Sequence, residues 1–250
     1  MLNKYLKRIG YDGSLEPNKE NLFKLQYCHL HSIPYENLDI MRGVPFTLDI
    51  DDVLDKIITR QRGGYCFELN GAFSWLLKSL GYKVTEYFGR FLRGKDSDMP
   101  MRRHRVIRVD LDDDSYICDV GVGGVCPSVP LKLEEGLEQD GIETMYKFGK
   151  DPVFGWIIYE KAGSEWREYY GFTEEPQYPI DFVTTDFYCQ MAPDSFFRQS
   201  NMASIRTENG RKTIAGNEFR IFSGDSVLTE VMDSDKRMAE VLREHFGIVL

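Results

Sequence analysis

The hydrophobic period of the chain changes near Gly81 and again near Pro179, and these changes constrain the fold more than any other feature. Up to Gly81 apolar residues recur at helical spacing, and between Tyr82 and Phe172 they alternate as in half-buried strands. Helices followed by successive antiparallel strands predict an α+β fold in which the strands form a barrel or curled sheet. After Pro179 helical and strand patterns are mixed.

The same pattern places the individual elements. We expect helices over 3–9, 18–32, 50–61 and 66–80, and strands over 82–91, 101–109, 115–120, 145–148, 154–161 and 165–172. The last region predicts a helix over 181–190, a hairpin of 204–207 with 211–215 about a type I′ turn at Asn209-Gly210, and a final helix between Ser234 and Gly247. No repeat or clear linker separates the regions, so we expect them to pack as one body.

The segment Arg62-Gly63-Gly64-Tyr65-Cys66-Phe67-Glu68-Leu69-Asn70 places a thiol where a loop becomes a helix. A helix N-terminus carries roughly half a positive charge, which favours thiolate over thiol, and Arg62 is near in the sequence. Cysteines in such places have pKa values of about 3.5–7.5 instead of about 8.5. The alternative is a small core residue, because free cysteines are among the most buried residue types. Other residues of the chain must decide whether Cys66 is a nucleophile or a core residue.

A hairpin downstream offers an imidazole and a carboxylate. His104 lies in its first strand, and Asp119 lies in the second, after an acidic turn. A register that pairs Val106 with Ile117 places His104 directly opposite Asp119, with β-carbons about 4.5–5.5 Å apart. Taken alone, His104 fits a surface strand histidine equally well, and Asp119 fits a turn former. Together with Cys66 they meet the requirements for a nucleophile, a base and an orienting group.

Four segments match motifs of one enzyme family in the same order. Segment 62–70 resembles its nucleophile motif, and Asp119-Val120-Gly121-Val122-Gly123-Gly124 resembles its Asp-Val-Gly-Phe-Gly segment. His29-x-x-x-Ile33-Pro34-Tyr35-Glu36-Asn37-Leu38 resembles its early Ile-Pro-Phe-Glu-Asn-Leu stretch, and Pro193-x-Ser195-x-Phe197 is similar to a weaker motif. The family is the arylamine N-acetyltransferases, and the resemblance covers most of the chain.

This resemblance implies a fold and a reaction. The implied regions are an N-terminal helical bundle over 1–81, a central antiparallel β-barrel over 82–178 and a C-terminal α/β lid over 179–250, around a cysteine-protease-like core. Cys66, His104 and Asp119 become the catalytic triad. Cys66 carries an acetyl group from acetyl-CoA to an arylamine or arylhydrazine, in a ping-pong reaction through an acetyl-cysteine intermediate.

The resemblance also implies residues for the acceptor, and the glycine-rich turn after Asp119 offers a contact for coenzyme A. The expected lining of the acceptor pocket is Tyr35, Phe91, Val122 and Phe197. Tyr35 and Val122 stand where phenylalanine is common in the family, which changes the stacking surface offered to the acceptor. We expect the glycines Gly123 and Gly124 to let coenzyme A approach the backbone closely, with a plain turn as the alternative.

Two further clusters have plain explanations beside functional ones. The basic residues around the first two predicted strands are Arg90, Arg93, Lys95, Arg102, Arg103 and Arg105. They fit either a solvated strand edge or a surface that attracts the phosphates of coenzyme A. Cys28-His29-x-His31 has metal-ligand residue types but no further ligand cluster, so helix packing is favoured and we expect no metal.

The composition of the chain limits which partners the protein can bind. The net charge of −9 argues against nucleic acid and anionic membranes. Five scattered cysteines suit a reducing cytosol, and the sequence has no signal-like or membrane-spanning apolar run, so we expect a cytoplasmic protein.

The alternative function is a papain-like or transglutaminase-like cysteine hydrolase, or an amide synthase, with the same triad. A transferase must keep water from its acyl-enzyme, whereas a peptidase needs an open substrate groove.

Overall fold

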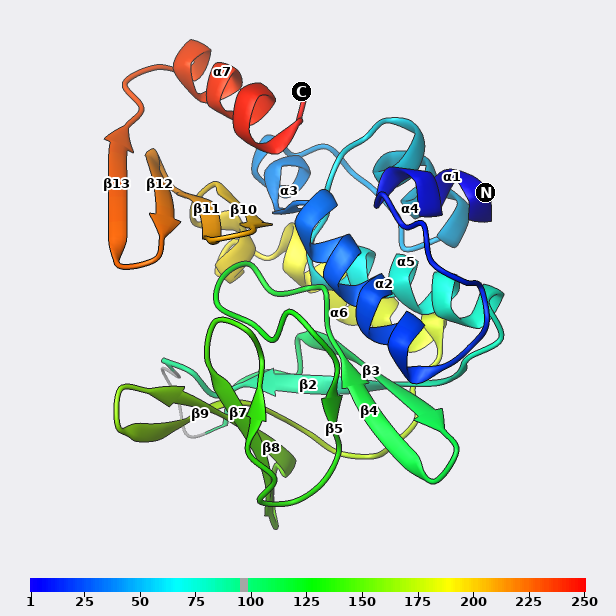
Figure 1. Cartoon of the computed structure of the whole chain (residues 1–250). Helices are drawn as coiled ribbons and strands as arrows, with labels where there is room; N and C mark the ends of the chain where they lie inside the picture. The colour runs from blue at the N-terminus through cyan, green and yellow to red at the C-terminus, as the bar shows by residue number, and fades with distance from the viewer. Residues whose placement is uncertain (95–98) are drawn as a thin grey trace.

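The computed structural model describes residues 1–94 and 99–250, and its first third is helical as predicted (Figure 1). The helices are α1 (Leu2–Arg8), α2 (Lys19–Ser32), α3 (Leu38–Arg42), α4 (Ile50–Leu54), the π-helical η1 (Asp55–Thr59) and α5 (Cys66–Ser79). Helix α2 begins after Asn18, whose side chain accepts the N–H of Asn21. The single helix expected over 50–61 is instead α4 followed by the π turn η1, in which Lys56 is buried.

Within the described residues, eight strands form one antiparallel sheet that curls into a nearly closed barrel, which confirms the predicted α+β fold. They are β2 (Lys83–Phe91), β3 (His104–Leu111), β4 (Asp114–Cys118), β5 (Leu131–Lys132), β6 (Gln139–Asp140), β7 (Met145–Asp151), β8 (Gly155–Ala162) and β9 (Glu165–Phe172), in the order β5-β4-β3-β2-β9-β8-β7-β6. The side-chain amide of Gln139 joins the two end strands, because it accepts the N–H of Lys132 at 2.7 Å and donates to its carbonyl at 2.9 Å. Helix α5 packs against β2 and β3, so the helices and the barrel share one core.

The β3–β4 hairpin does not have the predicted register. Ile117 pairs with Arg108 rather than with Val106, so the pairing is shifted by two residues. The cause is a tight two-residue turn in which Asp112 has a left-handed φ of 50°. An even shift keeps every side chain on the same face of the sheet. His104 and Asp119 are therefore not directly opposed, and both lie just beyond the paired residues, with Asp119 following the last residue of β4.

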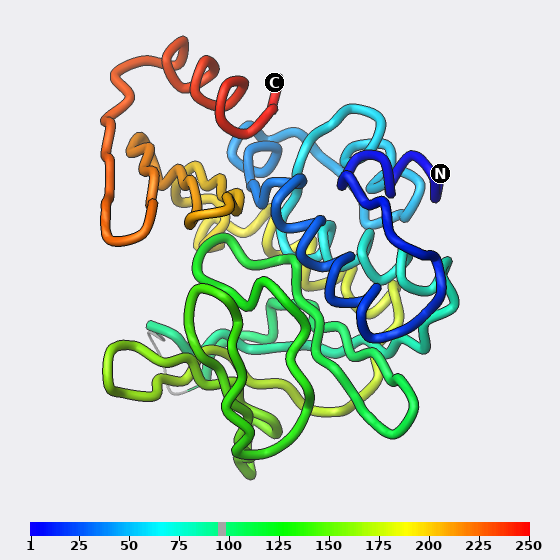
Figure 2. Tube along the Cα trace, in the orientation of Figure 1, coloured from blue at the N-terminus to red at the C-terminus, as the bar shows by residue number. Residues whose placement is uncertain are grey.

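The third region contains a helix and a second sheet. Its elements are α6 (Pro179–Met191), the 3₁₀ turn η2 (Phe196–Arg198), β10 (Met202–Thr207), β11 (Gly210–Ala215), β12 (Glu218–Ser223), β13 (Ser226–Val231) and α7 (Asp235–Phe246). The N-terminal region adds β1 (Tyr35–Glu36), giving the order β1-β10-β11-β12-β13. The sequence pattern did not indicate β12 and β13, because β13 is exposed along most of its length and has no buried apolar face. In Figure 2 the yellow α6 passes behind the blue and cyan helices, which brings it next to α5.

The turn between β10 and β11 also differs from the prediction. Thr207 pairs with Gly210, so the loop residues are Glu208 and Asn209, and neither has a positive φ. A type I′ turn needs positive φ at both central residues, so the predicted turn type is wrong although the hairpin is present. Gly210 has φ 151°, and a β-carbon there would lie 2.3 Å from the Phe222 carbonyl oxygen, which explains the glycine.

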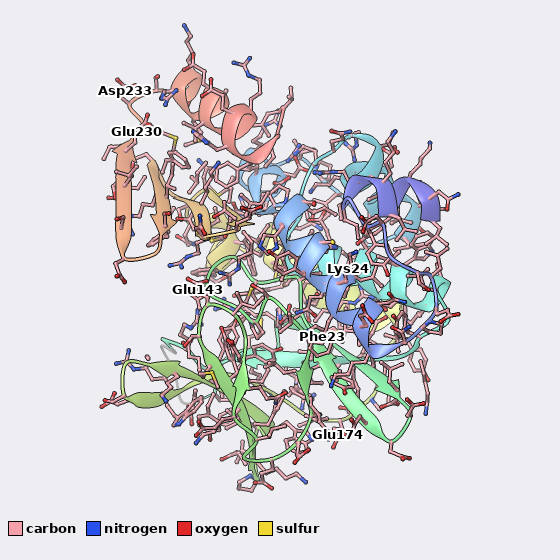
Figure 3. The ribbon with its side chains drawn as sticks, viewed as in Figure 1. Phe23, Lys24, Glu143, Glu174, Glu230 and Asp233 are labelled. Carbon is pink, nitrogen blue, oxygen red and sulfur yellow. The ribbon has the colours of Figure 1, made fainter. Side chains whose placement is uncertain are left out.

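An ionic cluster joins the barrel to the second sheet. Glu143, which lies between β6 and β7 and is labelled in Figure 3, pairs with Arg206 of β10 and Arg211 of β11. Arg206 is buried and also donates to the carbonyl oxygen of Cys126 at 2.7 Å. The three regions are thus in contact, and the boundaries at 81 and 178 remain predictions. Among the described residues, no helix is both long enough and apolar enough to span a membrane.

Candidate active site

Cys66 is the first residue of α5, as the glycine-rich loop before it predicted. The Glu68 carboxylate caps the helix by accepting the Tyr65 N–H at 3.1 Å. Cys66 is only 2% exposed, and its thiol donates to the carbonyl oxygen of Arg103 at 3.5 Å. The sulfur therefore lies beside the residue that precedes His104 at the start of β3.

A buried ionic network fixes the loop before Cys66. Lys56 bridges Glu68 and Asp39, each at 2.8 Å. Arg62 pairs with Glu36 at 2.7 Å and with Asp39 at 3.1 Å. Burial raises the pKa of Glu68 to about 7, although Lys56 opposes the shift. The carboxylates engage Arg62, so its observed role is to hold the loop rather than to act on the thiol.

His104 and Asp119 contact each other as predicted, despite the shifted register. His104 Nε2 lies 2.6 Å from Asp119 Oδ2, and both side chains are buried. Burial raises the pKa of Asp119, but the nearby His104 and hydrogen bonds to the carboxylate outweigh it and hold the pKa below its usual value. The other nitrogen, His104 Nδ1, is buried and has no hydrogen-bond partner among the described residues. It is the ring atom free to accept a proton.

Asn70 orients this pair, a role that the sequence reasoning missed. Its Nδ2 donates to Asp119 Oδ1 at 2.9 Å and to the Arg105 carbonyl at 2.6 Å, and its Oδ1 accepts the Val120 N–H. The Gly121 N–H also donates to Asp119 Oδ1 at 2.9 Å. The sequence spacing could have indicated this role. Asn70 follows Cys66 by four residues, so it lies one helical turn away on the same face of α5.

The pKa of Cys66 moves in the direction opposite to the sequence prediction. Burial raises the pKa of the Cys66 thiol, and the proximity of Cys189 and Asp119 raises it further. The backbone N–H groups of Arg105 and Phe67 act in the lowering direction but do not prevail. The helix N-terminus alone therefore does not produce a thiolate, and ionisation of Cys66 requires an acceptor for its proton.

Aromatic side chains surround the site. The Phe91 ring lies 4.8 Å from the His104 ring, and the Tyr170 ring lies 5.1 Å from it on centroid distances. The Phe197 ring meets the Tyr65 ring edge-on at 5.0 Å. Phe91 thus lies directly at the imidazole, whereas Phe197 lies beside the residue that precedes Cys66.

The glycine segment after Asp119 packs against protein atoms. A β-carbon on Gly121 would lie 2.8 Å from Cys66 Cα, and one on Gly123 would lie 2.4 Å from the Tyr35 ring. Gly124 has open space around it, and Val122 is half-buried against the main core. Tyr35, Val122 and Gly124 border the same small cavity. The assignment of these residues to the acceptor or to coenzyme A remains a prediction.

The basic residues predicted as a cluster are separated in the structure. Arg105 is buried and pairs with Glu86, and Arg93 pairs with Glu160. The Arg103 guanidinium lies 5.1 Å above the Phe196 ring. Arg90 donates to the Pro100 carbonyl, Arg102 pairs with Glu175, and Lys95 lies outside the described residues. Most of these charges are therefore engaged with protein groups.

The Cys28-His29-x-His31 segment lies in α2. His29 is buried and its Nδ1 hydrogen-bonds the Tyr5 hydroxyl at 3.0 Å, while His31 Nδ1 bonds the Tyr27 carbonyl at 2.7 Å. The part of the chain that the structure describes contains no group of three metal-ligand side chains. The two histidines have packing and hydrogen-bonding roles in the helix.

The chain belongs to the N-acetyltransferase family, whose model matches residues 18–250. Arylamine N-acetyltransferases of Mycobacterium tuberculosis and Escherichia coli are 31% and 30% identical to it, over 99% of this chain and 89% of theirs. The predicted family is thereby confirmed.

Solved structures give the same result. The arylamine N-acetyltransferase of Salmonella typhimurium superposes with a TM-score of 0.93 at 29% identity, covering 99% of this chain and 90% of that one. The Mycobacterium marinum enzyme in complex with CoA superposes with a TM-score of 0.92 at 30% identity, covering 99% and 93%.

Proposed function

We propose that this chain transfers an acetyl group from acetyl-CoA to an arylamine or arylhydrazine through Cys66. The observation that carries the proposal is the buried His104–Asp119 pair. It leaves His104 Nδ1 without a hydrogen-bond partner among the residues that the structure describes, at the start of the strand that borders the Cys66 sulfur. The relatives' name, arylamine N-acetyltransferase, supports an arylamine as the acceptor, and the CoA complex of the Mycobacterium marinum enzyme supports a coenzyme A thioester as the donor. The net charge of −9 and the free thiols support a cytoplasmic setting without a nucleic-acid partner.

In the first half-reaction Cys66 gives its proton to His104 Nδ1, and the thiolate attacks the carbonyl carbon of the thioester. A new C–S bond forms and the carbonyl oxygen becomes an oxyanion, which the backbone N–H groups at the start of α5 are placed to stabilise. When the oxyanion collapses, the bond to the coenzyme A sulfur breaks. Coenzyme A leaves as a thiol with the proton from His104, and acetyl-Cys66 remains.

In the second half-reaction the amine nitrogen attacks the carbonyl carbon of acetyl-Cys66. His104 takes a proton from the amine and returns one to the departing Cys66 sulfur, so charge is balanced at the end of the cycle. Asp119 holds the proton on Nε2 and thereby keeps Nδ1 available. Phe91 at the imidazole, with Tyr35, Val122 and Phe197, forms the proposed acceptor lining, and Gly123 and Gly124 the proposed coenzyme A contact.

Intact-mass measurement after mixing with acetyl-CoA, without an acceptor, tests the proposal. We expect one acetyl group per chain, located on Cys66 by peptide mapping, and its loss when an arylamine is added. A hydrolase of the papain or transglutaminase type, or an amide synthase with another acyl donor, would not accumulate this adduct from acetyl-CoA. An unmodified chain, or acetylation at another residue, contradicts the proposal.

The raised pKa of Cys66 makes its reactivity depend on His104. In the wild type we expect iodoacetamide to label Cys66 before Cys28, the most exposed of the five cysteines, even near pH 6, because His104 accepts the thiol proton. In His104→Gln the thiol keeps the pKa raised by burial, so labelling should be slow at neutral pH and increase as pH rises. Peptide mapping after timed alkylation at several pH values measures both. Faster labelling of Cys28 at pH 6 would contradict the expectation.

Val122 is predicted to set the preference among acceptors. Valine in place of a phenylalanine ring removes an aromatic contact worth about 0.5–1.5 kcal/mol and leaves space for larger amines. Val122→Phe should shift the kcat/KM ratio toward single-ring amines by up to roughly tenfold, since about 1.4 kcal/mol corresponds to one decade. The acetylation half-reaction serves as the control and should change little. Equal ratios for one- and two-ring amines in both proteins would exclude Val122 from the acceptor site.

A further inference from the structure

The outer face of α6 carries an apolar stripe that nothing in the described structure covers. Ile180, Val183, Phe187 and Met191 are 75%, 45%, 66% and 53% exposed. Their spacing of three and four residues places them on one side of the helix. Tyr178, 68% exposed, continues the stripe at the N-terminal end. We call these five residues the α6 stripe.

The opposite side of α6 is already buried in the protein. Phe182, Asp186 and Cys189 face inward, and the Asp186 carboxylate accepts the hydroxyl of Tyr65. A helix that is apolar on both sides is typical of one covered on both sides. The five residues of the α6 stripe are about half to three-quarters exposed. Two of them are aromatic side chains, which bury about 150–250 Å² each, and three are smaller apolar ones, so the stripe presents on the order of 600 Å². This is close to the roughly 800 Å² per partner of a standard interface.

The charges at the two ends of the stripe are opposite. Asp181 is exposed at the N-terminal end, where its carboxylate accepts the Tyr178 N–H at 2.7 Å. Arg198 is exposed at the C-terminal end, where it donates to the Met191 carbonyl at 2.6 Å. Neither Asp181 nor Arg198 forms an ion pair with another described residue. At the same end the Asp194 carboxylate accepts a hydrogen bond from the Tyr188 hydroxyl, and the Arg103 guanidinium lies nearby. Two arginines and one aspartate therefore leave this end with a net positive charge.

We propose that the α6 stripe is the interface of a homodimer in which α6 of a second copy of this chain packs antiparallel on it. A two-fold axis across the middle of the helix brings Ile180 of each copy to Met191 of the other, with Val183 and Phe187 of both copies between them. The same operation brings Asp181 of each copy to Arg198 of the other, twice by symmetry. A parallel arrangement would oppose like charges, as well as like ends of the helix dipoles.

A lipid surface is the other occupant that an apolar stripe suggests. Helices that lie on membranes carry rows of lysine and arginine beside the apolar face. Helix α6 contains no lysine or arginine, and the chain has a net charge of −9, which anionic lipid would repel. A second copy with its complementary end charges therefore fits the stripe better than a bilayer.

Sedimentation velocity of the full chain over a wide range of concentration tests the proposal. We expect a species of twice 29.0 kDa that dissociates on dilution. Phe187→Glu should give the monomer under all conditions, because two carboxylates would be buried at the centre of the interface. Leu228→Glu, at a 68% exposed position on β13, is the matched control and should leave the dimer intact. Circular dichroism verifies that each variant is folded.

Charge exchange tests the antiparallel orientation. Arg198→Glu should weaken dimerisation about tenfold, and the double variant Asp181→Lys with Arg198→Glu should recover most of the loss because the pairs are rebuilt with signs exchanged. A monomeric wild type at every concentration, or a Phe187→Glu variant as dimeric as the wild type, overturns the proposal. Flotation of a monomeric wild type with phosphatidylcholine vesicles would also overturn the proposal, because it would show that a lipid surface covers the α6 stripe.

Discussion

Cys66→Ser is expected to abolish acetyl transfer while leaving a folded protein. The replacement is nearly isosteric, and the site around it, from Gly121 to the Arg103 carbonyl, accommodates a smaller atom without strain. We expect the loss of acetyl transfer to come from the acidity of the side chain and not from a change in the fold. The thiol can give its proton to His104 before the attack, whereas a serine hydroxyl is far too weak an acid to be ionised in advance by an imidazole. The loss in kcat/KM should be at least roughly four decades.

The measurement compares steady-state transfer and acetyl-adduct formation in the variant and the wild type. Cys28→Ser is the matched control, because it makes the same atomic change in α2, and it should keep nearly full activity. Thermal unfolding of both variants separates a chemical defect from a folding defect. Residual transfer above about one per cent, or an acetyl adduct on the Cys66→Ser chain, would show that the nucleophile lies elsewhere.

Asp119→Asn is expected to lower kcat by roughly three to four decades with little change in stability. Asp119 Oδ1 accepts from Asn70 Nδ2 and from the Gly121 N–H, so the asparagine must place its carbonyl oxygen there. Its amide nitrogen then faces His104 Nε2 and can only donate. Nε2 becomes the acceptor of the ring, the proton moves to Nδ1, and His104 can no longer take the proton of Cys66.

Two readouts distinguish this from a structural role. Iodoacetamide labelling of Cys66 near neutral pH should slow together with kcat, because both depend on His104 Nδ1. Asp113→Asn, in the exposed turn of the same hairpin, should leave both rates unchanged. An effect of Asp119→Asn below about tenfold would mean that the carboxylate only supports the fold and that another group orients the histidine.

Some of these properties can be deduced from the sequence alone. The change from helical to alternating period predicted the α+β fold, because periodicity is a local property that burial on one face imposes. The loop-to-helix transition at Cys66 was predictable for the same reason, since two glycines and the start of an apolar repeat lie within a short segment. His104 and Asp119 could be paired because an even error in register does not change the face of a strand.

Other properties depended on contacts between distant segments. The sequence placed Arg62 near the thiol, but Glu36 and Asp39, which pair with it, come from an earlier helix and strand. The pKa of Cys66 was predicted from the helix N-terminus, whereas burial under several elements decides its direction. Strand β13 gave no clear signal, because it is exposed along most of its length and has no buried apolar face.

Local spacing therefore determined which residues of this chain are candidates for chemistry: a thiol at a helix start, an imidazole and a carboxylate on one face of a hairpin. Only the tertiary structure decided the orientation and the protonation of these side chains. Asn70 hydrogen-bonds Asp119, burial raises the pKa of Cys66, and His104 Nδ1 has no hydrogen-bond partner within residues 1–94 and 99–250, as the proposed proton transfer requires. The physical reason is that pKa values and side-chain orientation depend on desolvation and on partners from distant parts of the chain, which periodicity does not encode.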